Sequence, residues 1–375
     1  MDYDLCVVNV GSRTRDAETV EGIWEHSLTT RPINDLLGNI VKKENELLAK
    51  KIIPEVVVCG NGAAGTELAF GYKRRWSDLF GQEIKVSIVS SQDHVLVGQP
   101  RTAIVEVMNK LKKHNIEVIK NERVKRIEHD GVVFESGKKA SCNVAVWATG
   151  AEAQPITLKS DLAINKGYFN VNDFLQSTSH SNVFAGGDCI TIESYQDEKP
   201  TFPPKAGVYA VREGPIIAQN LCNMIEGKPL VKYVPQRSFL SLLMTGDGEC
   251  ISNKYGIAFS GRWVWNMKDW IDRGFMKLFD PHYLFEDYAN KGTQTRLANN
   301  ELFDDEDKDL QALLKPIKAR VATMDPITAG KLLSCDEHEE EFHERFQILM
   351  RMHNDEAFEK QVVQNFAPKY ITQHW

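Results

Sequence analysis

Closely spaced cysteines are missing from this sequence. Seven cysteines are scattered through 375 residues, and no two of them stand in a CxxC or CxxxxC spacing. This absence excludes a redox dithiol and offers no pattern for a zinc site, so we expect no bound metal. An odd, dispersed set of thiols is typical of a reducing compartment. We expect a cytoplasmic protein, with a mitochondrial or membrane-peripheral location as the alternatives.

A basic surplus and long apolar runs are missing too. The formal net charge of −7 argues against nucleic-acid binding. No run approaches the roughly 18 apolar residues that mark a transmembrane helix, and we expect no secretory signal because no apolar core follows the first residues. With 42% apolar and 26% charged residues the composition is that of a globular protein, and the length predicts two or three domains.

The sequence does contain a regular alternation of short β-branched runs and helical stretches, which predicts an α/β fold with parallel strands. We expect strands at residues 4–10, 55–59, 85–90, 116–119, 144–147 and 182–185. We expect helices at residues 33–50, 102–114 and 207–225, and a small β-meander at residues 124–139.

One glycine-rich motif, GNGAAG, stands where strand 55–59 should pass into a helix. In a dinucleotide fingerprint Gly60 permits the tight turn, Gly62 lets a pyrophosphate approach the backbone, and Gly65 lets the helix pack closely. The helix N-terminus then offers N–H groups to the phosphates. The motif predicts an NAD(P)-binding turn; the alternative is a glycine-rich turn without a ligand.

The second strand of such a unit normally ends in an acid that binds the ribose 2′-hydroxyl. Here the tip is Ser90, with Asp93 slightly beyond, so Ser90 is the candidate cofactor contact. The choice between NADH and NADPH stays open. Arg101 is a candidate for a 2′-phosphate, although a surface arginine is the simpler interpretation.

Two further triplets end expected buried strands: Ala148-Thr149-Gly150 and Gly186-Gly187-Asp188. In this order after a dinucleotide fingerprint, they resemble the pyridine nucleotide-disulfide oxidoreductase superfamily of flavoproteins, which have two Rossmann-like lobes. The stretches most similar to its NADH-dehydrogenase-like module associated with selenide, water dikinase are RPINDLL (31–37), FPPKAGVYAVREGP (202–215), SFLSLLMTGDG (238–248) and GRWVWNMKDWIDRGFM (261–276). The resemblance covers about residues 1–280.

The resemblance implies FAD and NAD(P)H as cofactors. It assigns Gly150, Gly187 and Asp188 to cofactor binding, with the Asp188 carboxylate on the ribityl hydroxyls of the flavin. Lys205, at the start of the next helix, would add positive charge beside the flavin and is the candidate catalytic residue; a surface lysine is the alternative. Without a dithiol, we expect hydride transfer from NAD(P)H to the flavin and onward to an external quinone or a selenium or sulfur species.

The superfamily's first fingerprint, which binds the ADP half of FAD, has no counterpart in this sequence. We therefore expect an N-terminally incomplete chain, in which about 100 residues of the flavin lobe are missing or are supplied by a second polypeptide. The alternative function is a non-catalytic nucleotide-binding or interaction protein that has lost FAD.

The expected domain order follows from these assignments. Residues 1–50 and 151–230 would form an incomplete flavin lobe, with residues 51–150 as an inserted NAD(P) lobe. A small α+β region at residues 231–288 and a charged helical tail at residues 289–375 would complete the chain.

Two C-terminal features have alternative interpretations. Segment 261–279 places Trp263, Met267 and Trp270 on one face of an expected helix, which suits peripheral membrane contact. The simpler alternative is docking on the core or on a second copy in a homodimer. His338 and His343 would lie on different faces of a helix, which argues against a metal site.

Overall fold

The computed structural model describes residues 3–198, 201–237, 239–254, 257–277, 308–333, 342–355 and 357–362. The chain forms two compact units. Unit 1 consists of residues 1–15, 151–239 and 276–304, and unit 2 of residues 16–150, 240–275 and 305–375. Strands β2 (Ser12–Thr14) and β11 (Ala151–Ala153) pair antiparallel in unit 1. They flank residues 16–150, the first segment of unit 2.

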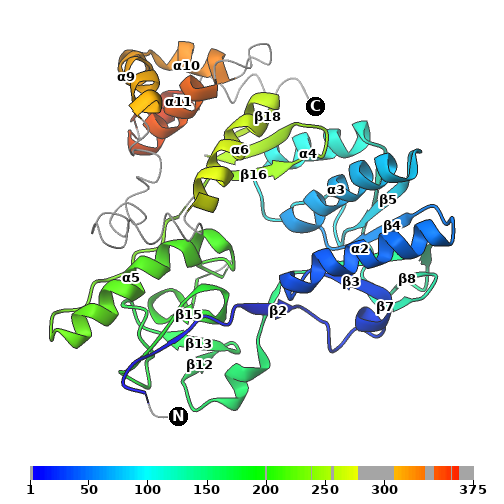
Figure 1. The fold of residues 1–375 in the computed structure, drawn as a ribbon, viewed down its shortest axis with the longest axis horizontal. Helices are drawn as coiled ribbons and strands as arrows, with labels where there is room; N and C mark the ends of the chain where they lie inside the picture. Colours follow the sequence, from blue (N-terminus) through cyan, green and yellow to red (C-terminus); the bar gives the residue numbers. More distant parts are fainter. Residues whose placement is uncertain are drawn as a thin grey trace. The chain divides into compact units, whose positions relative to one another are not determined.

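A five-stranded parallel sheet forms the centre of unit 2 (Figure 1). In spatial order its strands are β3 (Ser27–Thr29), β10 (Val144–Trp147), β4 (Glu55–Cys59), β5 (Lys85–Val89) and β6 (Ile116–Ile119). β10 is buried throughout and β4 is buried from its second residue on. A parallel sheet covered on both faces requires such continuous apolar runs.

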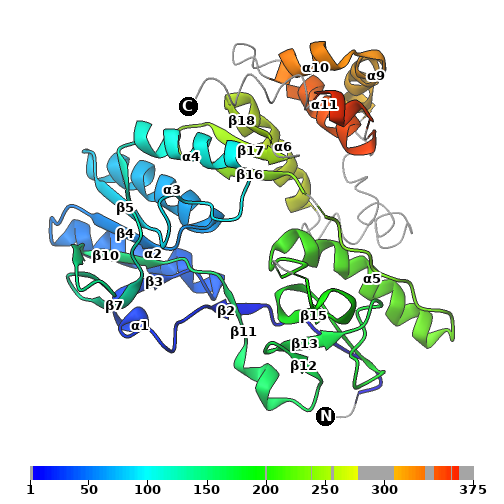
Figure 2. The same cartoon turned by 180° about the vertical axis from the view of Figure 1, so that it is seen from behind.

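Alternate side chains of the strands reach opposite faces of this sheet. On one face Val58 and Val146 pack with helices α2 (Ile33–Ala49), α3 (Ala63–Phe80) and α4 (Arg101–Lys113). On the other face Val57 and Trp147 pack with helix α1 (Ile23–His26) and the meander β7 (Val124–Glu128), β8 (Gly131–Phe134) and β9 (Lys139–Ser141). Figure 2 shows α3 and α4 on one side of β4 and β10, and β7 on the other.

Residues 240–275 add a small antiparallel sheet to the helical side of unit 2. Its strands, which pack on α3 and α4, are β16 (Ser241–Met244), β17 (Cys250–Lys254) and β18 (Ile257–Gly261). These strands lie within residues 231–288, for which a small α+β region was predicted. The Gly246-Asp247 turn joins β16 to β17.

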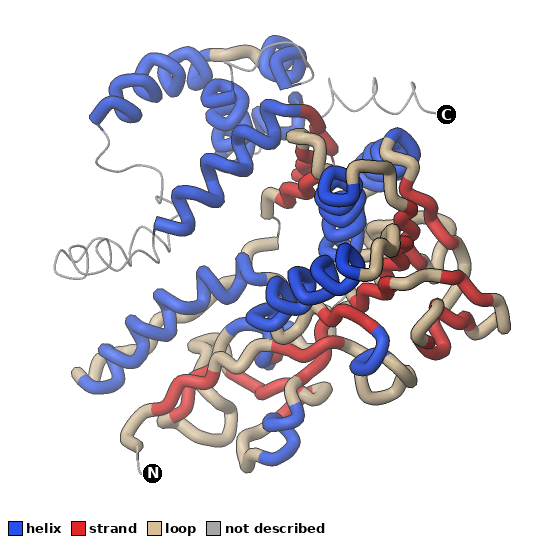
Figure 3. The backbone as a smooth tube through the Cα atoms, turned by 45° about the vertical axis from the view of Figure 1, so that its right-hand side comes forward, coloured by secondary structure: helices blue, strands red, loops and turns tan. Residues whose placement is uncertain are grey.

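Helix α6 (Arg262–Lys277) follows, where the sequence predicted the Trp-rich helix. Its Trp263 and Met267 are 3% and 0% exposed, because they share an apolar cluster with the helical tail. The described part of the tail, drawn as helices in Figure 3, includes α9 (Lys308–Thr323), α10 (Pro326–Leu333) and α11 (Phe342–Asn354). This packing agrees with the simpler alternative, in which the helix docks on the core of the protein. The predicted end of the helix, at residues 278–279, lies outside the described residues. Among the helices that the structure describes, none is both long and apolar enough to cross a membrane.

Unit 1 contains the parallel pair β1 (Cys6–Val8) and β14 (Val183–Ala185). A second sheet has the strands β12 (Ile164–Asn165), β13 (Tyr168–Val171) and β15 (Ile190–Ile192). Helix α5 (Gly207–Ile225) begins and ends where predicted, and its Ile217 shares the core of this unit with Phe184 and Ile190. A short 3-10 turn, η2 (Gly187–Cys189), follows β14 directly.

The structure differs from the predicted domain order at two places. Residues 16–50, assigned to the flavin lobe, lie in unit 2, because β3 pairs with β10 and Leu47 of α2 enters the main apolar cluster. Residues 240–275 also belong to unit 2, through packing on α3 and α4. The domain boundaries of the two-lobed protein as a whole stay predictions.

Candidate functional site

The fingerprint turn lies between β4 and α3, the context that the motif requires. Gly60 has a φ of 140°, and a Cβ atom on it would lie 2.3 Å from the carbonyl oxygen of Ala148. A Cβ atom on Gly65 would lie 2.1 Å from the carbonyl oxygen of Gly60. Both positions therefore demand glycine, because the turn passes against the end of β10 and against the first turn of α3.

Gly62 has open surroundings by contrast. A Cβ atom on this residue would meet nothing within 4 Å, and the residue is exposed. Gly62 is the N-cap of the 18-residue helix α3, and no side chain caps that end. The N–H groups and the positive dipole end of the helix therefore face open space, which fits a pyrophosphate group.

Ser90 directly follows β5, which ends one residue earlier than predicted, and its hydroxyl group is already engaged. The side chain is 1% exposed, and Oγ donates a hydrogen bond of 2.6 Å to the carbonyl oxygen of His94. The same oxygen accepts hydrogen bonds from Asn61 Nδ2 at 2.8 Å and from the Gln92 N–H at 3.1 Å. Ser90 thus ties the fingerprint loop to the loop after β5, and a direct contact with a cofactor stays a prediction.

The Gly186-Gly187-Asp188 turn lies at the carboxyl end of the β1–β14 pair. The Gly186 N–H donates to the carbonyl oxygen of Val8 at 3.1 Å, which anchors the start of the turn. Gly187 has a φ of 75°, and a Cβ atom there would lie 2.8 Å from Asn9 Oδ1. Asp188 follows, half-buried, and its Oδ2 accepts a hydrogen bond of 2.8 Å from the Ser12 hydroxyl. The carboxylate is thus fixed at the edge where parallel strands bind nucleotides.

Lys205 lies two residues before the first residue of α5 and is not a plain surface lysine. Its ammonium group donates a hydrogen bond to the carbonyl oxygen of Ile190 and lies 4.3 Å from the ring centroid of Tyr168. Burial lowers the pKa of Lys205, while the negative charges of Asp188 and Glu213 oppose that shift. The structure therefore brings Lys205 and Asp188, two predicted site residues, into one electrostatic cluster.

Glu213 on α5 is a third member of this cluster, which the sequence analysis missed. It is 2% exposed, and its Oε2 accepts a hydrogen bond of 2.5 Å from the Gly187 N–H. Burial raises the pKa of Glu213 to about 7, against the opposing effects of the Gly187 N–H and Lys205, and the charge of Asp188 raises it further. An acid beside Arg212 in the largely apolar stretch GVYAVREGPIIA was the available signal.

The remaining predicted residue, Gly150, is exposed and follows β10 at the end of unit 2's first segment. The predicted residues are thus divided between the units. Gly60, Gly62, Gly65, Ser90 and Gly150 belong to unit 2, and Gly187, Asp188 and Lys205 belong to unit 1.

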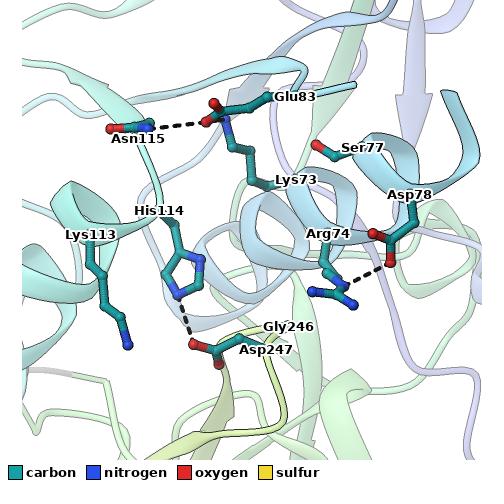
Figure 4. Close-up of a pocket in the computed structure, with 10 residues that line it drawn as sticks. All are labelled: Lys73, Arg74, Ser77, Asp78, Glu83, Lys113, His114, Asn115, Gly246 and Asp247. Carbon is teal, nitrogen blue, oxygen red and sulfur yellow. Dashed lines mark hydrogen bonds and ion pairs between the residues drawn. The ribbon is translucent and has the colours of Figure 1, made fainter. Parts of the chain in front are cut away.

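A pocket of about 250 Å³ opens in unit 2 beside α3, the end of α4 and the β16–β17 turn (Figure 4). Its ionisable side chains have partners: Lys73 with Glu83 at 2.7 Å, Arg74 with Asp78 at 2.7 Å, His114 with Asp247 at 2.9 Å, and Lys113 with Glu249 at 3.9 Å. The pair of His114 with Asp247 fastens the Gly246-Asp247 turn to α4. Because these charges compensate one another, we interpret the pocket as a packing gap between this turn and the helices α3 and α4 rather than as a ligand site.

Metal-binding side chains do not gather in the part of the chain that the structure describes, where no group of three His, Cys, Asp or Glu residues could hold an ion. His338 and the side chain of His343 lie outside the described residues. The six cysteines that the structure describes are free thiols.

Two nucleotide-type turns, each following a parallel strand, define the class of a two-lobed nucleotide-binding oxidoreductase fold. The model of the pyridine nucleotide-disulphide oxidoreductase family matches residues 1–214. The chain therefore belongs to this family, and the predicted superfamily is confirmed.

Curated relatives share about a quarter of their residues with this chain. The type II NADH:quinone oxidoreductase of Haemophilus influenzae is 26% identical over 286 residues, covering 68% of this chain and 64% of the relative. The NADH oxidase of Methanocaldococcus jannaschii is 28% identical over 233 residues, covering 60% and 48%. Human ferroptosis suppressor protein 1 is 28% identical over 211 residues, covering 52% of each protein. The chain thus spans about half to two thirds of the length of these relatives.

Solved structures confirm the predicted α/β class with Rossmann-like lobes. NDH2 from Plasmodium falciparum in complex with NADH superposes with a TM-score of 0.63 at 16% identity, covering 72% of this chain and 74% of that one. The sulfide:quinone oxidoreductase from Aquifex aeolicus gives a TM-score of 0.60 at 21% identity, covering 74% and 69%. At these identities the likeness establishes the fold.

Proposed function

We propose that this chain binds NAD(P)H and FAD and takes part in hydride transfer from NAD(P)H to a quinone-like acceptor. The observation that carries the proposal is the presence of both nucleotide-type turns in one chain: the open Gly62 turn and the Asp188 turn with its buried ionisable groups. The named activities of two relatives, NADH:quinone oxidoreductase and NADH oxidase, support it.

The residues present fit both cofactors. The space at Gly62 and the N–H groups of α3 suit the pyrophosphate of NAD(P)H. The Asp188 carboxylate, held by Ser12, suits the ribityl hydroxyls of FAD. When bound, FAD supplies the ring that accepts a hydride and passes its electrons on. Lys205 contributes a positive charge in the same unit as Asp188, which suits a site that gains negative charge.

The electrons would leave to an external acceptor rather than to a protein disulfide. Cys189 adjoins Asp188, but its Sγ is buried 3.1 Å from the carbonyl oxygen of Gly186, and burial raises the pKa of the thiol. A neutral, buried thiol is a poor nucleophile and a poor redox group. A selenium or sulfur acceptor, the link to selenide, water dikinase, a homodimer, peripheral membrane contact and a cytoplasmic location all stay predictions.

The test is an absorption spectrum of the purified chain before and after addition of FAD, followed by NADH or NADPH and then a soluble quinone. We expect a flavin band that the reduced nucleotide bleaches and the quinone restores. Asp188→Ala should lose the band, whereas Glu198→Gln, which removes an exposed acid paired with Arg237 in the same unit, should keep it. A folded chain that takes up no flavin contradicts the proposal; NADH binding by that chain would favour the non-catalytic nucleotide-binding alternative.

A further inference from the structure

Three ionisable side chains act on one another at the Gly187–Asp188 turn. Asp188 and Glu213 supply two carboxyl groups, and Lys205 supplies an ammonium group that acts on both. Glu213 is the most deeply placed of the three, since it is 2% exposed while the other two are half-buried. Its Oε2 holds the Gly187 N–H at 2.5 Å, directly before Asp188 in the chain.

The other titratable groups near Glu213 come from three elements. Cys189 belongs to the turn itself, and burial raises the pKa of its thiol. Tyr233, after α5, has its pKa raised by burial and by the charge of Glu213. Arg212 and Tyr209 stand on α5, where burial lowers the pKa of Arg212 and raises that of Tyr209. Of these groups, Cys189 donates to the Gly186 carbonyl oxygen, whereas Glu213 accepts from the Gly187 N–H.

We propose that Glu213 is a positioning residue of the flavin site: its carboxyl group fixes the Gly187 N–H and thereby Asp188, and it takes up a proton when a flavin covers the turn. The inference rests on the proposed function and deepens it. No role of this kind follows from the sequence motif, because the motif places only Asp188 at the flavin.

The direction of the effect follows from the causes of the pKa shift. Burial is the largest cause that raises the pKa of Glu213, to about 7, and a bound flavin would remove further water from the turn. The phosphates of a bound FAD would also add negative charge to this unit. Both changes favour the neutral carboxyl group, so binding takes up a proton, and the affinity for FAD should fall as the pH rises through about 7.

The experiment compares FAD affinity at pH 6 and pH 8 for the full chain and the variants Glu213→Gln and Glu213→Ala. The native chain should bind more tightly at pH 6, by up to about tenfold, because the free carboxyl group is mostly protonated at pH 6 and mostly ionised at pH 8. Glu213→Gln keeps an acceptor for the Gly187 N–H but cannot ionise. It should bind equally at both pH values, matching the native chain at pH 6 and exceeding it at pH 8.

Glu213→Ala removes the acceptor as well and should bind FAD more weakly than Glu213→Gln at both pH values. The control Glu198→Gln should keep the native pH dependence, because Glu198 is paired with Arg237 and no contact joins it to the turn among the described residues. A merely structural role for Glu213 predicts weaker binding by Glu213→Gln at both pH values with the native pH dependence preserved. That result would overturn the inference.

A second measurement separates this inference from the proposed function. In the flavin-free chain, ¹³C NMR of the glutamate carboxyl groups should show one resonance that titrates near pH 7 and is absent from Glu213→Gln. If neither the native chain nor any variant takes up flavin, the proposed function fails, and proton uptake on flavin binding fails with it. A Glu213 resonance that titrates like an ordinary glutamate overturns the inference even where FAD binds.

Discussion

The carboxyl group of Glu67 on α3 accepts a hydrogen bond of 3.0 Å from the backbone N–H of Met244 on β16, 177 residues further along the chain. This bond ties the helix of the fingerprint turn to the C-terminal sheet of unit 2. Burial raises the pKa of Glu67, although the Met244 N–H lowers it. The fingerprint helix is thus held at two points, by its own sheet and by a segment outside the fingerprint unit.

The Glu67–Met244 bond predicts a graded loss of stability. Glu67→Ala leaves the Met244 N–H without its acceptor and should lower the free energy of unfolding by about 1–3 kcal/mol, while Glu67→Gln should cost less than about 1 kcal/mol. Urea unfolding followed by tryptophan fluorescence measures both. Equal losses for the two variants would show that the bond contributes nothing.

Two of the three glycines of the fingerprint, Gly62 and Gly65, predict different effects of substitution by alanine. Gly65→Ala places a Cβ atom 2.1 Å from the Gly60 carbonyl oxygen and should destabilise unit 2 by about 3 kcal/mol or more. Gly62→Ala meets nothing within 4 Å, so stability should change by less than about 1 kcal/mol. The added methyl group would nevertheless occupy the space proposed for the pyrophosphate. NADH titration by calorimetry should show at least about a tenfold loss of affinity for Gly62→Ala, and unchanged affinity would remove Gly62 from the site.

Glu44 predicts a stability difference that depends on pH. It is 5% exposed and accepts hydrogen bonds from Arg75 Nε at 2.6 Å and from Trp76 Nε1 at 2.6 Å. The hydrogen bond from Arg75 is the largest cause that lowers the pKa of Glu44 below its ordinary value of 4.5, and burial opposes it. A lowered carboxyl pKa contributes stability that is fully present above 4.5 and is lost as the pH falls through the folded-state value.

Glu44→Gln should therefore lower the free energy of unfolding by about 1–3 kcal/mol at pH 7. The difference from the native chain should shrink as the pH falls below 4.5, where the native carboxyl group also becomes neutral. Urea unfolding at several pH values measures the difference. A difference that is the same at pH 7 and pH 3 would assign the loss to packing rather than to charge.

Trp263 distinguishes the docking of α6 from membrane contact. Because Trp263 is 3% exposed and the Arg345 guanidinium lies 4.9 Å from its ring centroid, Trp263→Ala should cost about 3–5 kcal/mol of stability. Trp24→Ala, at a side chain 51% exposed in the same unit, should cost less than about 1 kcal/mol. Co-sedimentation with liposomes should be the same for both variants. A Trp263→Ala variant of native stability that loses liposome binding would favour the membrane interpretation.

The sequence predicted the central elements because their signals are local. Strands 116–119 and 144–147 and helix 207–225 begin and end at the predicted residues, since β-branched runs and glycine- or proline-rich turns delimit them. The three-residue strands β2, β3 and β11 were missed. Each depends on a partner more than a hundred residues away, as in the pair of Thr14 with Ala151, and no local pattern records such pairing.

The candidate site was predictable where backbone geometry sets the residue type. The steric requirement at Gly60 and Gly65 follows from the motif, and the structure shows the contacts that impose it. Glu213 was not predictable in the same way, because its partner, the Gly187 N–H, lies 26 residues earlier. The burial that shifts its pKa arises only when α5 packs beside the turn.

The pairing of Thr14 with Ala151 has a consequence for how the chain can be cut and rejoined. These residues stand opposite each other in the β2–β11 ladder, one just before residues 16–150 and the other just after them. Antiparallel partners lie only about 4.5–5.5 Å apart between Cα atoms, so a turn of a few residues could join them. A chain shortened in this way would retain the Asp188 turn, Lys205 and Glu213 on a continuous backbone, as a minimal scaffold for grafting a different nucleotide-binding module.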